Sequence, residues 1–116
     1  MNQGKGGFAS RRDGENLILT VTGEIDHHSA VRIRADMDAL ILEARPERTV
    51  IDLSEVDFMD SSGLGLIMGR FALQKRCGGT LAVLDPSPAV MKMIKLAGMD
   101  RMLSILKTKV KGNETE

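Results

Sequence analysis

The chain has 116 residues, enough for one domain with a substantial buried core, and its 42% hydrophobic and 28% charged residues are ordinary for a globular protein. Sixteen basic and sixteen acidic residues cancel, so no overall field favours nucleic acid or an anionic membrane. Three Phe without Trp or Tyr also offer few stacking platforms for single-stranded nucleic acid. A lone Cys77, no signal-peptide pattern and no apolar run of about 20 residues predict a cytoplasmic protein without membrane contact.

The first predicted elements form a hairpin. Residues 1–7 are glycine-rich and polar, and we expect a flexible leader there. A short edge strand over 8–12 and a turn at Asp13-Gly14 follow. The β-branched run over 17–22 predicts a central strand that ends at Gly23.

A polar loop and an amphipathic helix come next. The loop extends from Gly23 to Ser29, and Asp26 or Ser29 is expected to cap the helix. Apolar residues then recur at helical spacing up to Ala44, which indicates a helix lying on a sheet, and Pro46 closes it.

The second half of the chain alternates between strands and helices. Strands are predicted over 49–53, 80–84 and 102–106, and helices over 62–77 and from 88 to Gly98, which ends the second of them. The resulting order is β-β-α-β-α-β-α-β. It predicts a single α/β domain over 8–106, with a mostly parallel sheet of four to five strands, an antiparallel N-terminal edge strand and helices packed against it. Residues 107–116 are expected to form a disordered polar tail.

Chemistry-bearing side chains follow two strands of this sheet. Because the carboxyl ends of parallel strands gather at one edge, we expect the two following loops to share a surface. Ser61 lies at a strand-to-helix turn where a phosphate can be tolerated, whereas Ser62 is the better candidate for a helix cap. Gly65 and Gly69 leave a smooth groove on the helix, although Gly69 is also expected to permit close packing. The loop residues concerned are Asp26, His27, His28, Asp60, Ser61 and Ser62.

Three kinds of site fit the residues poorly. A Ser-His-Asp hydrolase would place its serine in Gly-x-Ser-x-Gly, which is absent around Ser61. His27 and His28 are adjacent and have no third His or second Cys to complete a metal site. The glycines at 63 and 65 lack the Lys of a phosphate-binding loop. We therefore predict no catalytic residues and no metal.

Two segments together resemble the STAS-domain anti-sigma factor antagonists. They are Gly23–Ala30, which reads Gly-Glu-Ile-Asp-His-His-Ser-Ala, and Phe58–Gly65, which reads Phe-Met-Asp-Ser-Ser-Gly-Leu-Gly. Asp-Ser-Ser-Gly is characteristic of the family, and Gly-Glu-x-Asp-His-His narrows the resemblance to the sporulation branch, which antagonises the anti-sigma-F factor. The resemblance extends from about Phe8 to Leu106 and implies the STAS fold. Family members usually end in a further amphipathic helix, for which 107–116 is too short and polar.

The resemblance implies a regulatory binding protein rather than an enzyme, with no cofactor. Such antagonists are monomers in family precedent and bind a dimeric anti-sigma factor that is also a serine kinase, which displaces the sigma factor. The kinase phosphorylates the first Ser of the motif, here Ser61, and the phosphoprotein dissociates; a metal-dependent PP2C-type phosphatase restores the active form. The implied partner-binding residues are Asp26, Asp60, Ser61, Ser62, Gly63, Leu64 and Arg70.

Two alternatives stay open. One is a STAS module of another partner-switching pathway, such as the general stress response. The other is a nucleotide-binding or nucleotide-hydrolysing protein that acts at the same loops.

Overall fold

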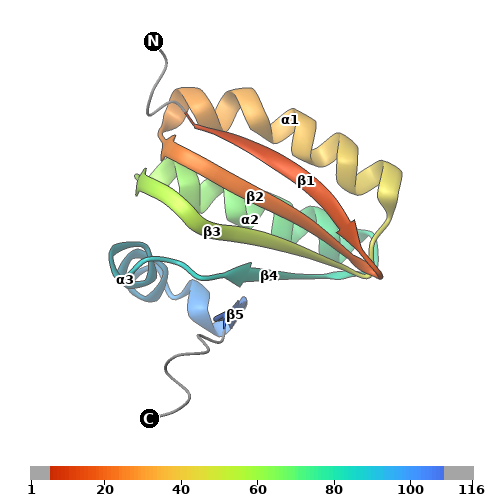
Figure 1. Cartoon of the computed structure of the whole chain (residues 1–116). Coiled ribbons are helices and arrows are strands. Elements are labelled where there is room, and N and C mark those ends of the chain that lie inside the picture. The colour runs from red at the N-terminus through yellow and green to blue at the C-terminus, as the bar shows by residue number, and fades with distance from the viewer. Residues whose placement is uncertain (1–5, 109–116) are drawn as a thin grey trace.

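The computed structural model describes residues 6–108, which form a five-stranded sheet with helices packed against it (Figure 1). β1 is antiparallel to β2, and the other neighbouring strands are parallel. This mixed sheet confirms the predicted fold class. In sheet order, which is also chain order, the strands are β1 (Gly7–Asp13), β2 (Asn16–Ile25), β3 (Arg48–Met59), β4 (Thr80–Leu84) and β5 (Ser104–Leu106).

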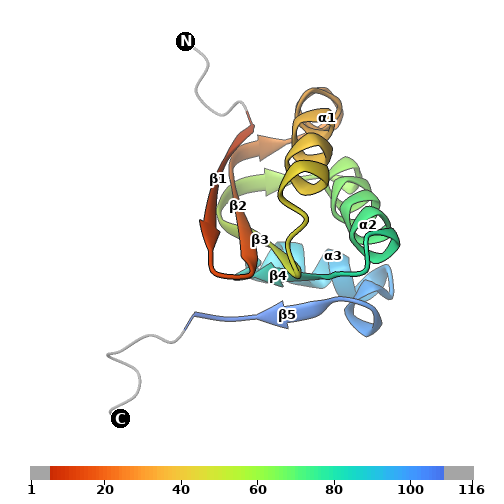
Figure 2. The same cartoon turned by 90° about the vertical axis from the view of Figure 1, so that its right-hand side faces the viewer.

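Three α-helices connect the parallel strands. They are α1 (His27–Ala44), α2 (Ser61–Arg76) and α3 (Pro88–Leu96), and a 3₁₀ turn over Met99–Arg101 leads into β5. Figure 2 shows α1 and α2 side by side on one face of the sheet. No helix within residues 6–108 is both long enough and apolar enough to cross a membrane.

The hydrophobic core lies between the sheet and these helices. Its most buried side chains are apolar residues with less than 2% of their surface exposed, and burial of each contributes on the order of 1.5–3 kcal/mol. All three helices contribute, so each is anchored to the sheet. Examples are Leu19 and Ile51 from the sheet, Met37 and Ile41 from α1, Ile67 from α2 and Ile94 from α3.

A buried hydrogen-bond network fastens the C-terminal end of α2. Gln74 is fully buried; its Nε2 donates to the carbonyl of Pro46 over 2.9 Å, and its Oε1 accepts from the hydroxyl of Thr49 over 3.1 Å. Gly79 passes so close that a Cβ there would overlap the Gln74 amide. Both polar ends of the Gln74 side chain are therefore satisfied, which removes the penalty for burying it.

The two central strands are longer than predicted. β2 was expected to stop at Gly23 but continues to Ile25, and β3 was expected to stop at residue 53 but continues to Met59. Register shifts between Thr20 and Thr22 and between Gly23 and Glu24 allow β2 to keep pairing with β3. The predicted loop after Gly23 therefore shrinks to Asp26.

The ends of the described chain differ in detail from the prediction. β1 begins at Gly7 and Gly6 is buried, so the predicted leader boundary falls inside β1. Residues 1–5 lie outside the described part. The last strand was predicted over 102–106, but β5 begins at Ser104. Lys107 and Thr108 are exposed, and the rest of the predicted tail, 109–116, lies outside the described part.

Candidate functional site

β2 and β3 end side by side, and each leads directly into a helix. Ile25 pairs with Met59 as the last register position, and the N–H of Asp60 donates to the carbonyl of Ile25 over 3.1 Å. α1 therefore begins beside α2. This juxtaposition brings together the two segments that the sequence predicted to share a surface.

Asp26 caps α1, as expected. Its Oδ1 accepts the backbone N–H of Ser29 over 3.0 Å, and the Ser29 hydroxyl accepts the N–H of Asp26 over 2.9 Å, which completes a capping box. The N–H of Ser29 is the main cause of a lowered pKa of Asp26, and the Ser29 hydroxyl and His28 lower this pKa further. Asp26 is therefore ionised at neutral pH.

Asp60, and not Ser62, caps α2. Its Oδ1 accepts the backbone N–H of Ser62 over 2.8 Å, while its own carbonyl accepts the N–H of Gly63 over 2.9 Å. The prediction that Ser62 is the cap is therefore wrong. The physical reason is that β3 extends to Met59, which makes Asp60 the one residue between strand and helix.

Ser61 is the first residue of α2 and is exposed. Its hydroxyl makes no hydrogen bond within residues 6–108 and stands at the end of the helix where unpaired N–H groups and the helix dipole give positive potential. The side chain is thus accessible to a second protein and lies where added negative charge is tolerated.

Gly63, in the first turn of α2, packs against the buried Met59. A Cβ at Gly63 would overlap Cγ and Sδ of Met59, which is 5% exposed. This close contact fixes the first turn of α2 on the end of β3.

A groove of about 270 Å³ runs between α1 and α2, beginning at the capped helix ends. A Cβ added at Gly65 or at Gly69 would meet no atom within 4 Å, so the absence of side chains there opens the groove. The expectation that Gly69 permits close packing is therefore wrong. The groove is lined by His27, Ala30, Val31 and Arg34 of α1 and by Ser62, Gly65, Leu66, Gly69 and Arg70 of α2.

Arg70 lines this groove and forms an ion pair with Asp38 of α1. Its Nε lies 2.7 Å from Oδ1 of Asp38, although the angle is poor for a hydrogen bond, and neither atom has another partner in the described part of the chain. Nη1 donates to the carbonyl of Leu66 over 3.2 Å. Burial lowers the pKa of Arg70, and Asp38 opposes that shift. Only 7% of Arg70 is exposed, so little of its surface is available for contact with a partner protein.

The remaining apolar residues near the motif divide into buried and exposed ones. Leu66 is buried and Leu64 is half-buried against the core. Phe58, which the sequence reasoning did not select as a site residue, is 53% exposed. The signal in the sequence is strand alternation: Phe58 and Met59 are adjacent large apolar residues, so only one of them can face the core.

The two histidines lie together at the start of α1. Their rings stand edge to face with centroids 6.0 Å apart at the start of α1. Across residues 6–108, no group of three or more His, Cys, Asp or Glu side chains could hold a metal ion.

The family model that matches the chain is the STAS domain, over residues 8–113. An anti-sigma F factor antagonist from Paenibacillus polymyxa is 38% identical over 94 residues, which cover 81% of this chain and 80% of that protein. The chain belongs to the STAS family and, within it, to the anti-sigma factor antagonists.

Similar proteins represent two branches of the family. An anti-sigma-B factor antagonist from Bacillus subtilis is 28% identical over 82% of this chain and 85% of its own length. Among solved structures, that of the anti-sigma factor antagonist SpoIIAA in its unphosphorylated form is similar at 27% identity and a TM-score of 0.77, covering 93% of each chain. Its phosphorylated form, from Bacillus, is similar at 26% identity and a TM-score of 0.72, covering 93% of this chain and 96% of that one.

Proposed function

We propose that this protein is an anti-anti-sigma factor controlled by phosphorylation of Ser61. The unphosphorylated form binds an anti-sigma factor that is also a serine kinase, and the sigma factor is released for sporulation transcription. A PP2C-type phosphatase reverses the modification. The observation that carries the proposal is the exposed hydroxyl of Ser61 at the start of α2, beside the groove between α1 and α2.

A phosphate on Ser61 is compatible with the fold. It adds about −1.5 to −2 charges, which the positive end of α2 can stabilise. The similarity of this chain to SpoIIAA in both its unphosphorylated and phosphorylated forms supports one fold for both states. We expect the modification to change the surface and to leave the sheet and helices in place.

The same phosphate disfavours the bound state. Asp26 and Asp60 cap the two neighbouring helices, so a phosphate on Ser61 enlarges an acidic surface. A partner surface that matches a neutral hydroxyl would meet bulk and unpaired charge, which costs several kcal/mol in an interface. A cost of about 3 kcal/mol weakens binding by a factor of about 100.

Incubation with the purified anti-sigma-F kinase and radiolabelled ATP tests the proposal. We expect label on the wild-type protein and on Ser62→Ala, and none on Ser61→Ala. In a transcription assay with the sigma factor, Ser61→Ala should release sigma constitutively and Ser61→Asp should fail to do so. Normal regulation in both Ser61 variants would contradict the proposal.

A second candidate is the same switch in the general stress response. The similarity to the anti-sigma-B factor antagonist of Bacillus subtilis favours it. Parallel assays with anti-sigma-F and anti-sigma-B kinases distinguish the pathways, because only the cognate kinase should label Ser61 and lose its sigma factor. Nucleotide turnover without any kinase would instead indicate the nucleotide-binding alternative.

The remaining details of the proposal follow the resemblance to the family. We expect a monomer that engages a dimeric kinase in the cytoplasm, with no cofactor, no catalytic role, and Leu64, Gly63 and Arg70 in or beneath the contact surface. Light scattering of the free protein and of its complex with the kinase would measure both stoichiometries.

A further inference from the structure

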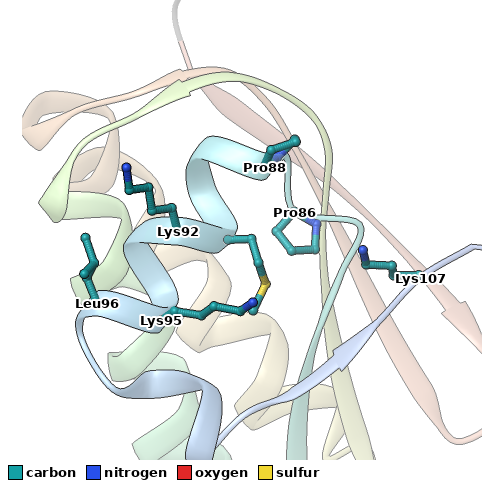
Figure 3. Close-up of a pocket in the computed structure, with 7 residues that line it drawn as sticks. Pro86, Pro88, Lys92, Lys95, Leu96 and Lys107 are labelled. Carbon is teal, nitrogen blue, oxygen red and sulfur yellow. The ribbon is translucent and has the colours of Figure 1, made fainter.

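A second groove, of about 580 Å³, lies away from the first and is built by α3 (Figure 3). Three separate parts of the chain form it: the segment after β4, one side of α3, and the segment after β5. Its apolar surface comes from Pro86, Pro88, Met91 and Leu96.

The apolar part of this groove is not explained by packing of the core. α3 buries Val90 and Ile94 against the sheet, with 4% and 0% of their surfaces exposed. Leu96 is 79% exposed, although it belongs to the same short helix. An isolated exposed leucine needs no explanation, but here it lies in one groove with Met91 and two prolines.

The charged residues that line the groove are all basic. Lys92 and Lys95 extend from α3, and Lys107 extends from the segment after β5 (Figure 3). Among residues 6–108, no acidic side chain lines the groove, whereas the chain as a whole carries equal numbers of acidic and basic residues. The lining charges are therefore positive, a local feature that the net charge conceals, and the Asp85 carboxylate beside Lys107 offsets part of them.

The backbone on both sides of Lys107 is held by hydrogen bonds to Asp85. Asp85 has a left-handed backbone with φ of 54°, and its N–H donates to the carbonyl of Leu106 over 2.9 Å. Its carboxylate accepts the backbone N–H of Thr108 over 2.7 Å and also accepts the Thr108 hydroxyl. The residues on both sides of Lys107 are thus tied to Asp85, which holds the third lysine opposite α3.

We propose that this groove binds an acidic, amphipathic segment of a partner protein. An aliphatic side chain of the segment would lie against Met91 and Leu96, and its carboxylates would pair with Lys92, Lys95 and Lys107. The concave shape favours a peptide over a lipid surface, since a nine-residue helix with one strongly exposed leucine offers little area for insertion in a bilayer. The proposal uses neither Ser61 nor the groove between α1 and α2, so it is independent of the proposed function.

The probe is a fluorescein-labelled amphipathic peptide of about twelve residues made of glutamate and leucine, in the helix-in-groove mode. With the full-length protein we expect saturable binding that weakens as salt is raised. Amide shifts of the isotope-labelled protein should centre on residues 86–96 and 107. Lys92→Glu/Lys95→Glu should weaken binding by at least about tenfold, because attraction becomes repulsion. Leu96→Ala should weaken it by about threefold to tenfold without loss of folding, because the leucine is exposed.

Lys75→Glu/Arg76→Glu is the matched control, because it makes the same charge change at exposed positions at the end of α2. It should bind like the wild type, and a lysine–leucine peptide should not bind. Equal affinity of the Lys92→Glu/Lys95→Glu variant and the wild type would overturn the proposal, as would amide shifts that centre on residues 58–70. Binding that appears only after residues 109–116 are removed would assign the groove to the chain's own end instead. Binding of phosphatidylglycerol vesicles without binding of the peptide would assign it to a lipid surface.

Discussion

Gly63 is the residue of the Asp-Ser-Ser-Gly motif at which packing most restricts substitution. Its backbone packs on the buried Met59, at the point where β3 passes into α2, and there is no room for a methyl group between them. Gly65, only two residues later in the same helix, has open space around its Cα because it faces the groove. The two glycines therefore serve different purposes: Gly63 allows close packing, whereas Gly65 keeps a surface clear.

Alanine substitutions at these two glycines should have opposite effects on stability. Gly63→Ala should lower the free energy of unfolding by about 1–3 kcal/mol, because displacement of Met59 outweighs the better helix propensity of alanine. Gly65→Ala should raise it by about 0.5–1 kcal/mol, because the methyl group meets nothing. Urea unfolding measures both. If Gly65→Ala is stable but binds the kinase less tightly, the groove takes part in docking; unchanged stability of Gly63→Ala would contradict the packing argument.

The cap of α2 shows how far residue-level prediction reaches. Asp60, Ser61 and Ser62 are all good N-cap residues, so composition could not choose between them. The choice depends on where β3 ends, and β3 ends at Met59 because Ile25 pairs with it from another strand. Asp26 was predicted correctly as one of two possible caps because aspartate is favoured at helix starts, and the structure adds the capping box with Ser29.

At the level of elements, α1 and α2 are joined by the Arg70–Asp38 ion pair, and the groove lies between their N-terminal halves. The side chain of Asp38 is 36% exposed and that of Arg70 only 8%. The guanidinium of Arg70 has less contact with water, so it depends more on the ion pair to compensate its charge. A buried charge that loses its counter-charge is costly, whereas a partly exposed carboxylate can be hydrated again.

A double-mutant cycle on this pair should show coupling. Asp38→Asn should lower the free energy of unfolding by about 1–3 kcal/mol, because it leaves a buried guanidinium without a full counter-charge. Arg70→Met should cost less than Asp38→Asn, because methionine replaces the aliphatic stem and Asp38 is rehydrated. We expect a coupling energy of at least about 0.5 kcal/mol. Additive effects in denaturant unfolding would mean that the pair does not join the helices.

The lengths of the elements were predictable for helices but not for strands. α1 and α2 end within one residue of prediction because 3.6-residue periodicity, Pro46 and Gly78 are local signals. β2 and β3 extend two and six residues beyond prediction because parallel pairing is non-local and the register shifts in β2 leave no pattern in the sequence.

For the whole molecule, the order of strands and helices was predictable, and so was the meeting of the two capped loops at one edge of the sheet. The groove on α3 was not, because it depends on Lys107 and Lys92 lining the same groove, and the two are separated in the chain by the 3₁₀ turn and β5. Asp85, with a left-handed backbone that is rare outside glycine, forms hydrogen bonds with the residues on both sides of Lys107. A groove formed by segments far apart in the chain cannot be predicted from the sequence until the fold is known.

Phosphorylation of Ser61 should be a surface event in a rigid domain. The N-terminal part of α2 is held by the Asp60 cap, by the packing of Gly63 on Met59 and by the ion pair of Arg70 with α1. We therefore expect a charge on Ser61, the first residue of α2, to leave the helix in place. We expect amide shifts between the phosphorylated and free proteins to be confined to residues 55–70 and to the adjacent start of α1, with shifts elsewhere close to zero. The hydrogen exchange of β4 and α3 should be unchanged, and Ser61→Ala treated with kinase and ATP is the control. Large backbone changes in β4, α3 or β5 would show that the switch works by rearrangement and not by local charge and bulk.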